Sequence, residues 1–213
     1  GLVTIQIKDL GIQEYLTIYD RMREFNDQRD SDTHDEIWLL EHLPVYTLGL
    51  AGKIENLLNT KNIPVINTDR GGQVTYHGPG QLIVYLLIDI KQQPYSIKKF
   101  VSLIEKSIID CLGGYEINAE RISGSPGVYV NGEKIAALGV RIKRGCTYHG
   151  LALNIDMDLK PFEGINPCGH EGLVCTQLLK HKKGVAFTEV KRKLTHHLIE
   201  NLDKPSDVLS DVA

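Results

Sequence analysis

VYVNGEKIAALGVRIK, residues 128–143, is the stretch that decides how this chain folds. Its Asn131-Gly132 pair favours the positive φ angles of a type I′ turn, so it predicts a tight hairpin between two strands. Side chains alternate between the faces of a strand. We therefore expect one face of the second strand to carry Lys134, Ala136 and Leu138, and the other to carry Ile135, Ala137 and Gly139. The small residues leave room for a ligand against this strand.

Outward from the hairpin, the chain contains more short stretches with strand-like patterning. These stretches are Leu2–Ile7, Glu36–Leu40, Val45–Leu48, Val65–Asn67, Leu82–Ile90, Val128–Val130, Lys134–Lys143 and His149–Ile155. Apolar residues at three- and four-residue intervals predict helices near Gln13–Gln28, Ser96–Leu112 and Thr188–Leu202, with Thr188 as an N-cap. Because strands cluster rather than alternate with helices, we expect an α+β fold with a mixed, largely antiparallel sheet packed with helices.

The length and composition are those of an ordinary globular protein. The 213 residues, 42% of them hydrophobic, contain no repeat, linker or low-complexity tract, so we expect a single domain over residues 1–213. The longest apolar run, Leu82 to Ile88, is much shorter than the roughly 18 residues of a membrane span. The N-terminus lacks the layout of a signal peptide. These features predict a cytoplasmic protein without membrane association.

The charge is uneven along the chain. The net charge of −3 argues against general nucleic-acid binding. Residues 121–200, however, hold 12 Lys and Arg against 7 Asp and Glu, a net charge of +5. A basic half on an acidic protein suggests an acidic partner, and a solvated surface face explains it equally well.

Four cysteines stand at positions 111, 146, 168 and 175, and none has the spacing of a zinc site or a CxxC pair. We therefore expect free thiols and no metal. Cys111 joins a helical apolar stripe, Cys146 opens a strand, and Cys175 follows two apolar residues. Only Cys168 lies in a polar loop shaped by Pro and Gly, NPCGHEG at residues 166–172. It is the candidate nucleophile, and the amides after it are candidates for an oxyanion hole.

A nucleophilic cysteine needs a neighbour that favours its thiolate. The sequence offers four candidates, which are His77, His149, His170 and Lys134. His170 is too close to Cys168 in sequence to turn onto it easily, and a His in a strand is more often structural. From the residues alone, Lys134 is most simply explained as an exposed hairpin lysine.

A glycine-rich segment, RGGQVTYHGPGQ at residues 70–81, lies between two predicted strands. A plain turn is the default explanation, and no Gly-Lys-Ser/Thr follows to make a phosphate loop. A plain turn does not need Arg, Gln, Thr, Tyr and His packed between its glycines, however. The composition indicates a ligand-binding loop.

Four motifs in order, RGGQVTYHGPGQ, GEKIAALGVRIKRG, TYHGLALN and NPCGHEG, together resemble the octanoyltransferases of lipoate synthesis over roughly residues 35–172. The resemblance implies a fold shared with the catalytic domains of biotin and lipoate protein ligases. It implies that Cys168 is the acyl-thioester nucleophile and that Lys134 tunes it, which replaces the exposed-lysine explanation. It also implies an octanoyl and pantetheine pocket lined by Arg70, Gly71, Gly72, Gln73, Val74, Thr75, Tyr76, His77, Ala137, Leu138, Gly139, His149, Gly150, Leu151 and Ala152.

The activity implied by this resemblance is the first step of protein lipoylation. Octanoyl-acyl carrier protein would deliver the octanoyl group on its phosphopantetheine as a substrate, and no separate cofactor is expected. The acceptor would be a lysine on lipoyl domains of 2-oxoacid dehydrogenases or on the glycine cleavage H protein. Acyl carrier proteins are acidic, so we expect basic residues of the positive segment to steer them: Arg141, Lys143, Arg144, Lys180, Lys182 and Lys183.

Three alternative activities stay open at this point. An ATP-dependent lipoate or octanoate ligase would form an acyl-adenylate and would not require Cys168. A cysteine-dependent acyl hydrolase would release the acyl group to water. A non-catalytic module would only dock carrier proteins.

Overall fold

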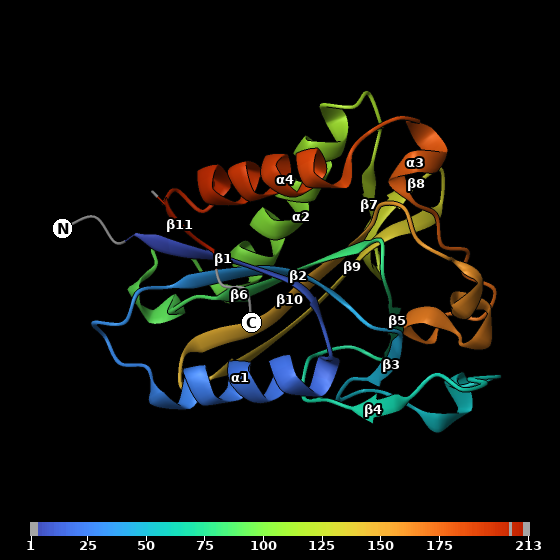
Figure 1. Ribbon diagram of the computed structural model, residues 1–213, viewed down its shortest axis with the longest axis horizontal. Helices are drawn as coiled ribbons and strands as arrows, with labels where there is room; N and C mark the ends of the chain where they lie inside the picture. The colour runs from blue at the N-terminus through green and yellow to red at the C-terminus, as the bar shows by residue number, and fades with distance from the viewer. Residues whose placement is uncertain (1–3, 205, 211–213) are drawn as a thin grey trace.

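The computed structural model describes residues 4–204 and 206–210, and a large twisted sheet runs through its centre (Figure 1). The strands of this sheet are β1 (Ile5–Gln13), β2 (Glu36–His42), β6 (Gln81–Leu87), β7 (Glu120–Ile122), β8 (Ser125–Val130), β9 (Glu133–Lys143), β10 (Cys146–Asn154) and β11 (Ser206–Ser210). Their order is β11-β1-β2-β6-β10-β9-β8-β7. Among the described strands of this sheet, only the pairs β1–β2 and β1–β11 are parallel. The predicted α+β class with a mixed, largely antiparallel sheet is confirmed.

A smaller sheet stands beside the large one. It has the order β4-β3-β5, formed by β4 (Val65–Asn67), β3 (Val45–Leu48) and β5 (Val74–His77). Strand β5 belongs to the glycine-rich segment, so this sheet carries the segment to the site. Short helical turns connect the larger elements: η1 (Ile54–Asn56), η2 (Ile90–Gln92), η3 (Lys160–Gly164), η4 (Pro167–Gly169) and α3 (Leu178–His181).

Long helices cover both faces of the large sheet. Figure 1 shows α2 (Ile97–Gly113) and α4 (Phe187–Asn201) on one face and α1 (Tyr15–Gln28) on the other. Strand β6 therefore has no polar face: Leu82 and Val84 pack in the core with α2 and α4, and Ile83 and Tyr85 pack in the core with α1. Within the part of the chain described, no helix is long and apolar enough to cross a membrane.

Several predicted boundaries differ from the structure. Of the predicted strand Leu2–Ile7, residues 2 and 3 lie outside the described range, and β1 continues to Gln13, where a helix was expected. The N-cap prediction for Thr188 is wrong, because α4 already begins at Phe187, after Ala186. Phe187 packs against the core, which explains the earlier start. Four further elements were not predicted from the sequence: β5, β7, β11 and α3.

The most consequential difference is a β-bulge in β9. Tyr129 of β8 pairs with Lys134, and its neighbour Val128 pairs with Ala136, so Ile135 is one residue too many for the ladder. Ala136 packs with Val128 in the core beneath α2 and α4. The predicted alternation placed Lys134 on that same face and is wrong there, because the bulge turns Lys134 to the opposite face.

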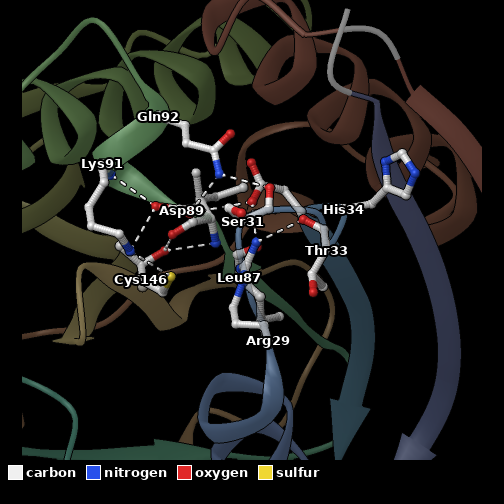
Figure 2. Close-up of polar contacts among 12 residues, drawn as sticks. Arg29, Ser31, Thr33, His34, Leu87, Asp89, Lys91, Gln92 and Cys146 are labelled. Carbon is white, nitrogen blue, oxygen red and sulfur yellow. Dashed lines mark hydrogen bonds and ion pairs between the residues drawn. The ribbon is translucent and has the colours of Figure 1, made fainter. Parts of the chain in front are cut away.

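Buried polar contacts fasten the C-terminal end of α1 to the sheet, and Figure 2 shows the part around Arg29 and Asp89. The Arg29 guanidinium donates to the Leu87 carbonyl at 3.0 Å and to the buried Asp35 carboxylate at 2.7 Å. Asp35 also accepts from the Asp89 amide at 2.8 Å. Because α1 is held at this end, its first residue, Tyr15, has a fixed place at the other end.

Candidate active site

Cys168 occupies a strained turn. It has φ 55° and ψ 24°, the left-handed region that non-glycine residues rarely adopt. Pro167 precedes it, and Gly169 follows with φ 73°. Such conformations cost on the order of 1–3 kcal/mol and cluster at functional sites. The Cys168 side chain is partly exposed, whereas the three other cysteines are buried.

Lys134 comes to Cys168 from the start of β9. Its side chain is almost fully buried, with 4% of the residue exposed, and its Nζ contacts Cys168 Sγ directly. Its backbone amide donates to the Val174 carbonyl at 2.9 Å, and its carbonyl accepts from the Thr176 amide at 2.8 Å. The chain just after Cys168 is therefore tied to Lys134 itself, which holds the two side chains together.

The predicted use of the amides after Cys168 is wrong. The Gly169 amide donates to the Asn166 carbonyl at 2.9 Å, and the His170 amide donates to the Pro167 carbonyl at 3.0 Å. Both hydrogen bonds close the turn itself. These two amides are therefore not free to bind an oxyanion.

A cavity adjoins the Cys168 thiol, between the glycine-rich segment and the sheet. Its walls include thirteen of the predicted pocket residues: Arg70, Gly72, Gln73, Val74, Thr75, His77, Ala137, Leu138, Gly139, His149, Gly150, Leu151 and Ala152. The paired strands β9 and β10 supply the last seven, and Gly139 faces Gly150 in the ladder. Chain segments more than 60 residues apart thus meet around one thiol.

Two predicted residues do not line this cavity. The Gly71 amide donates to the Val140 carbonyl at 3.1 Å, so Gly71 fastens the loop to β9 instead. Tyr76 alternates with Thr75 and His77 along β5, and its ring packs on Tyr46 and Phe162 with ring centroids 5.4 and 5.6 Å away. It therefore faces a different core.

Three residues of the wall were not predicted from the sequence: Tyr15, Ile83 and Tyr85. Ile83 and Tyr85 belong to a continuous apolar run that looks like plain core in the sequence. Tyr15 looks like an ordinary residue at a helix start. Only the fold brings them to the cavity, and no local signal distinguishes them.

A buried arginine shapes the loop around the cavity. The Arg70 guanidinium donates to the Gly71 carbonyl at 2.9 Å, to the Thr47 carbonyl at 2.9 Å and to the Gln73 carbonyl at 2.8 Å. Burial lowers the pKa of Arg70, and its Nε has no hydrogen-bond partner. Arg70 therefore holds the loop rigid and adds positive charge to the wall that borders Cys168.

Two of the histidines considered as bases are committed elsewhere. His77 donates from Nδ1 to Gln81 Oε1 at 2.8 Å, and burial lowers its pKa to about 3. His149 donates from Nε2 to Asp69 at 2.8 Å, and burial lowers its pKa too. His170 is exposed on the surface. Of the four candidates, Lys134 alone contacts the thiol.

Asp69 anchors the His149 side of the cavity. Burial raises the pKa of this carboxyl, but hydrogen bonds from His149 and Tyr148 outweigh it and bring the pKa down to about 2. Among residues 4–204 and 206–210, His, Cys, Asp and Glu side chains form no group of three or more that could hold a metal ion.

Comparisons with known proteins identify the family of this chain. Residues 13–199 match the family model described as the lipoyl protein ligase A/B catalytic domain. The chain belongs to this family. An octanoyltransferase from Azoarcus sp. (strain BH72) is 51% identical over 201 residues, which cover 94% of this chain and 88% of that protein. The resemblance to octanoyltransferases is confirmed.

Solved structures confirm the fold at low sequence identity. A lipoate-protein ligase A bound with ATP aligns with TM-score 0.81 and 12% identity, covering 98% of this chain and 90% of that one. A biotin protein ligase from Aquifex aeolicus in complex with biotin and ATP aligns with TM-score 0.57 and 14% identity, covering 93% and 70%. The predicted similarity to biotin and lipoate ligase catalytic domains is therefore correct.

Proposed function

We propose that this protein transfers an octanoyl group from octanoyl-acyl carrier protein to a lysine of a lipoyl domain, through a thioester on Cys168. The observation that carries the proposal is the contact between the buried Lys134 amine and the Cys168 thiol beside the cavity. An adjacent ammonium favours the thiolate, which is the reactive form of cysteine. The octanoyltransferase relatives support octanoyl transfer as the activity.

The first half of the reaction loads the enzyme. The Cys168 thiolate attacks the carbonyl carbon of the donor thioester, and a new carbon–sulfur bond forms. The old carbon–sulfur bond then breaks, and the departing pantetheine thiolate takes a proton from the Lys134 ammonium. One thioester replaces another, so this half needs no nucleotide.

The second half moves the acyl group to nitrogen. The acceptor lysine amine attacks the Cys168 thioester, the carbon–nitrogen bond forms, and the carbon–sulfur bond to Cys168 breaks. The neutral Lys134 amine takes the proton released by the acceptor, which restores the ammonium and thiolate. An amide is more stable than a thioester, so the transfer runs downhill.

A small chamber of about 10 Å³ adjoins the Lys134 and Cys168 side chains, with Phe162 and Pro167 in its wall. In the larger cavity beside Cys168, β9 and β10 offer small residues on which an alkyl chain can lie. Each buried CH₂ contributes about 0.8 kcal/mol.

The test is an assay with defined substrates. Octanoyl-acyl carrier protein and an apo lipoyl domain should give the octanoyl amide without ATP or Mg²⁺. Free octanoate with ATP and Mg²⁺ should give none. Product from free octanoate would place the chain among ATP-dependent ligases, and release of octanoate without amide would make it a hydrolase.

A further inference from the structure

The thioester on Cys168 lacks an obvious partner for its carbonyl oxygen. Attack on this carbonyl moves negative charge onto the oxygen, and acyl-transfer sites hold that charge with hydrogen-bond donors. The amides of Gly169 and His170 are used within the turn. Another donor beside Cys168 is therefore needed.

The Gln73 side chain lies at the required place. It lines the same cavity as Cys168. A Cβ added to Gly169 would lie 1.7 Å from Gln73 Oε1 and 3.0 Å from Gln73 Nε2, so the carboxamide packs directly on the backbone that follows the nucleophile. A side chain at position 169 would thus displace the Gln73 carboxamide, and glycine also suits the positive φ at this position.

A chain of side-chain amides orients this carboxamide. Asn166 Nδ2 donates to Asn56 Oδ1 at 3.2 Å, which commits the Asn56 oxygen. Asn56 Nδ2 donates to Gln73 Oε1 at 3.4 Å, a long hydrogen bond. The Gln73 oxygen is thereby engaged, and its Nε2 is the end left to donate to a ligand.

The backbone of Gln73 is equally fixed. Its carbonyl accepts from Arg70 Nη2 and from the Gly49 amide, each at 2.8 Å. Since Asn166 begins the turn of Cys168, the amide chain links the nucleophile's turn to the donor. The two are positioned together before substrate binds.

We propose that Gln73 Nε2 donates to the thioester carbonyl oxygen and to the oxyanion formed at each attack on it. When sulfur or nitrogen adds to the carbonyl carbon, the C=O electron pair moves to oxygen, where Gln73 stabilises it. The pair returns as the leaving sulfur departs, so Gln73 neither gains nor loses a proton. This inference rests on the proposed thioester chemistry and adds a catalytic residue to it.

The first experiment compares Gln73→Ala and Gln73→Glu with the unmodified protein. Loading of Cys168 from a small octanoyl thioester is measured together with alkylation of Cys168 by iodoacetamide, which forms no oxyanion. We expect kcat to fall about 10²–10³-fold in both variants with little change in KM. Alkylation should stay within about twofold. Gln28→Ala, on the exposed face of α1, is the matched control.

The second experiment tests the orientation. In Asn56→Asp, the introduced carboxylate only accepts hydrogen bonds, so it turns Gln73 Nε2 toward position 56 and the Gln73 oxygen toward the carbonyl. We expect Asn56→Asp to slow acylation more than Asn56→Ala does. Unchanged acylation in both Gln73 variants, or equal losses in acylation and alkylation, would overturn the inference. Failure of the unmodified protein to form the thioester would instead refute the proposed function.

Discussion

The Cys168–Lys134 pair combines features that are unfavourable in a folded protein, and the proposed function accounts for them. A lysine is buried, a cysteine is held at φ 55°, and both are fixed by backbone hydrogen bonds to each other's segments. Burying an ammonium is unfavourable unless a partner compensates for it. Cys168 Sγ, which Lys134 Nζ contacts directly, is the partner in the chemistry that we propose. Each residue therefore explains the unusual setting of the other.

Substitutions at Lys134 distinguish the effect of its positive charge from its proposed role as a proton carrier. Lys134→Ala should slow alkylation of Cys168 at neutral pH and lower octanoyl transfer by about 10²–10⁴-fold, since both the neighbouring charge and the proton carrier are lost. Lys134→Arg keeps the charge but cannot exchange protons, so alkylation should persist while transfer fails. Iodoacetamide kinetics and transfer assays measure the two effects. Lys98→Ala, exposed on α2, is the control.

The same variants can contradict the pairing. If Lys134→Ala leaves both alkylation and transfer unchanged, Lys134 has no part in activating Cys168. His77 and His149 would then be the next bases to test.

His42 and His77 make the protein sensitive to acid. Burial lowers their pKa values to about 4 and about 3, below the ordinary value of 6.5. Because the unfolded state binds more protons below pH 6.5, stability is complete above that pH and falls as the pH drops toward these values. Between pH 7 and pH 5, each histidine should reduce the free energy of unfolding by about 2 kcal/mol.

Urea unfolding at pH 7 and pH 5 measures this loss. His42→Gln should remove about 2 kcal/mol of the pH dependence, since it cannot gain a proton. His196→Gln, on an exposed part of α4, should leave the dependence unchanged. If the unmodified protein, His42→Gln and His196→Gln all lost the same free energy of unfolding between pH 7 and pH 5, the explanation would be contradicted.

Among the elements, β9 shows what the sequence could and could not predict. The Asn131-Gly132 pair predicted the hairpin, because the preference for a type I′ turn depends on the two residues themselves. The bulge at Ile135 was invisible, since it depends on how β8 pairs with β9 and on the segment at Val174. Alternation therefore assigned Lys134 to the wrong face, and only the resemblance to a family suggested the role that we propose for it.

Gly139 provides a test at the scale of the strand. A Cβ there would lie 2.7 Å from the Gly71 carbonyl oxygen, so Gly139→Ala should displace the loop that carries Arg70 and Gln73. We expect a folded protein with greatly reduced octanoyl transfer, measured beside its circular dichroism and thermal midpoint. Gly113→Ala, where an added Cβ meets nothing within 4 Å, should keep full activity. Normal activity in Gly139→Ala would show that the loop position is unimportant.

Across the whole molecule, some residues of the cavity wall could be predicted from the sequence and others could not. Residues within the glycine-rich segment, β9 and β10 carry motifs that a reader of the sequence can find. Tyr15, Ile83 and Tyr85 join them because helices cover both faces of the sheet and turn an apolar strand into a cavity wall. The register and layering that achieve this are long-range properties, which no local pattern encodes.

The fold also places the basic residues that we expect to steer the carrier in two separate regions of the molecule. Lys143 lies nine residues along β9 from Lys134, or roughly 30 Å at about 3.3 Å per residue. Lys143 and Arg144 already contact Asp27 at the end of α1. Lys180, by contrast, lines a groove of about 730 Å³ that includes Pro167, next to Cys168. Lys180 is therefore better placed than Lys143 to meet a carrier at Cys168, and Asp158, Glu163 and Glu171 line the same groove.

Charge reversal tests this division. The double variant Lys180→Glu and Lys183→Glu should raise KM for octanoyl-acyl carrier protein and weaken its salt dependence, with little effect on a small octanoyl thioester. Lys143→Glu with Arg144→Glu should change KM much less. Steady-state kinetics at two ionic strengths measure these changes in KM. A larger change in KM for Lys143→Glu with Arg144→Glu would place the carrier at the far end of β9.

We propose above that Cys168 carries the octanoyl group. Intact-protein mass spectrometry after brief mixing with octanoyl-acyl carrier protein, followed by peptide mapping, measures this directly. We expect a mass increase of one octanoyl group, located on Cys168, absent from Cys168→Ser and lost when an apo lipoyl domain is added. Amide formation with no adduct, or an adduct on another residue that the lipoyl domain discharges, would contradict it.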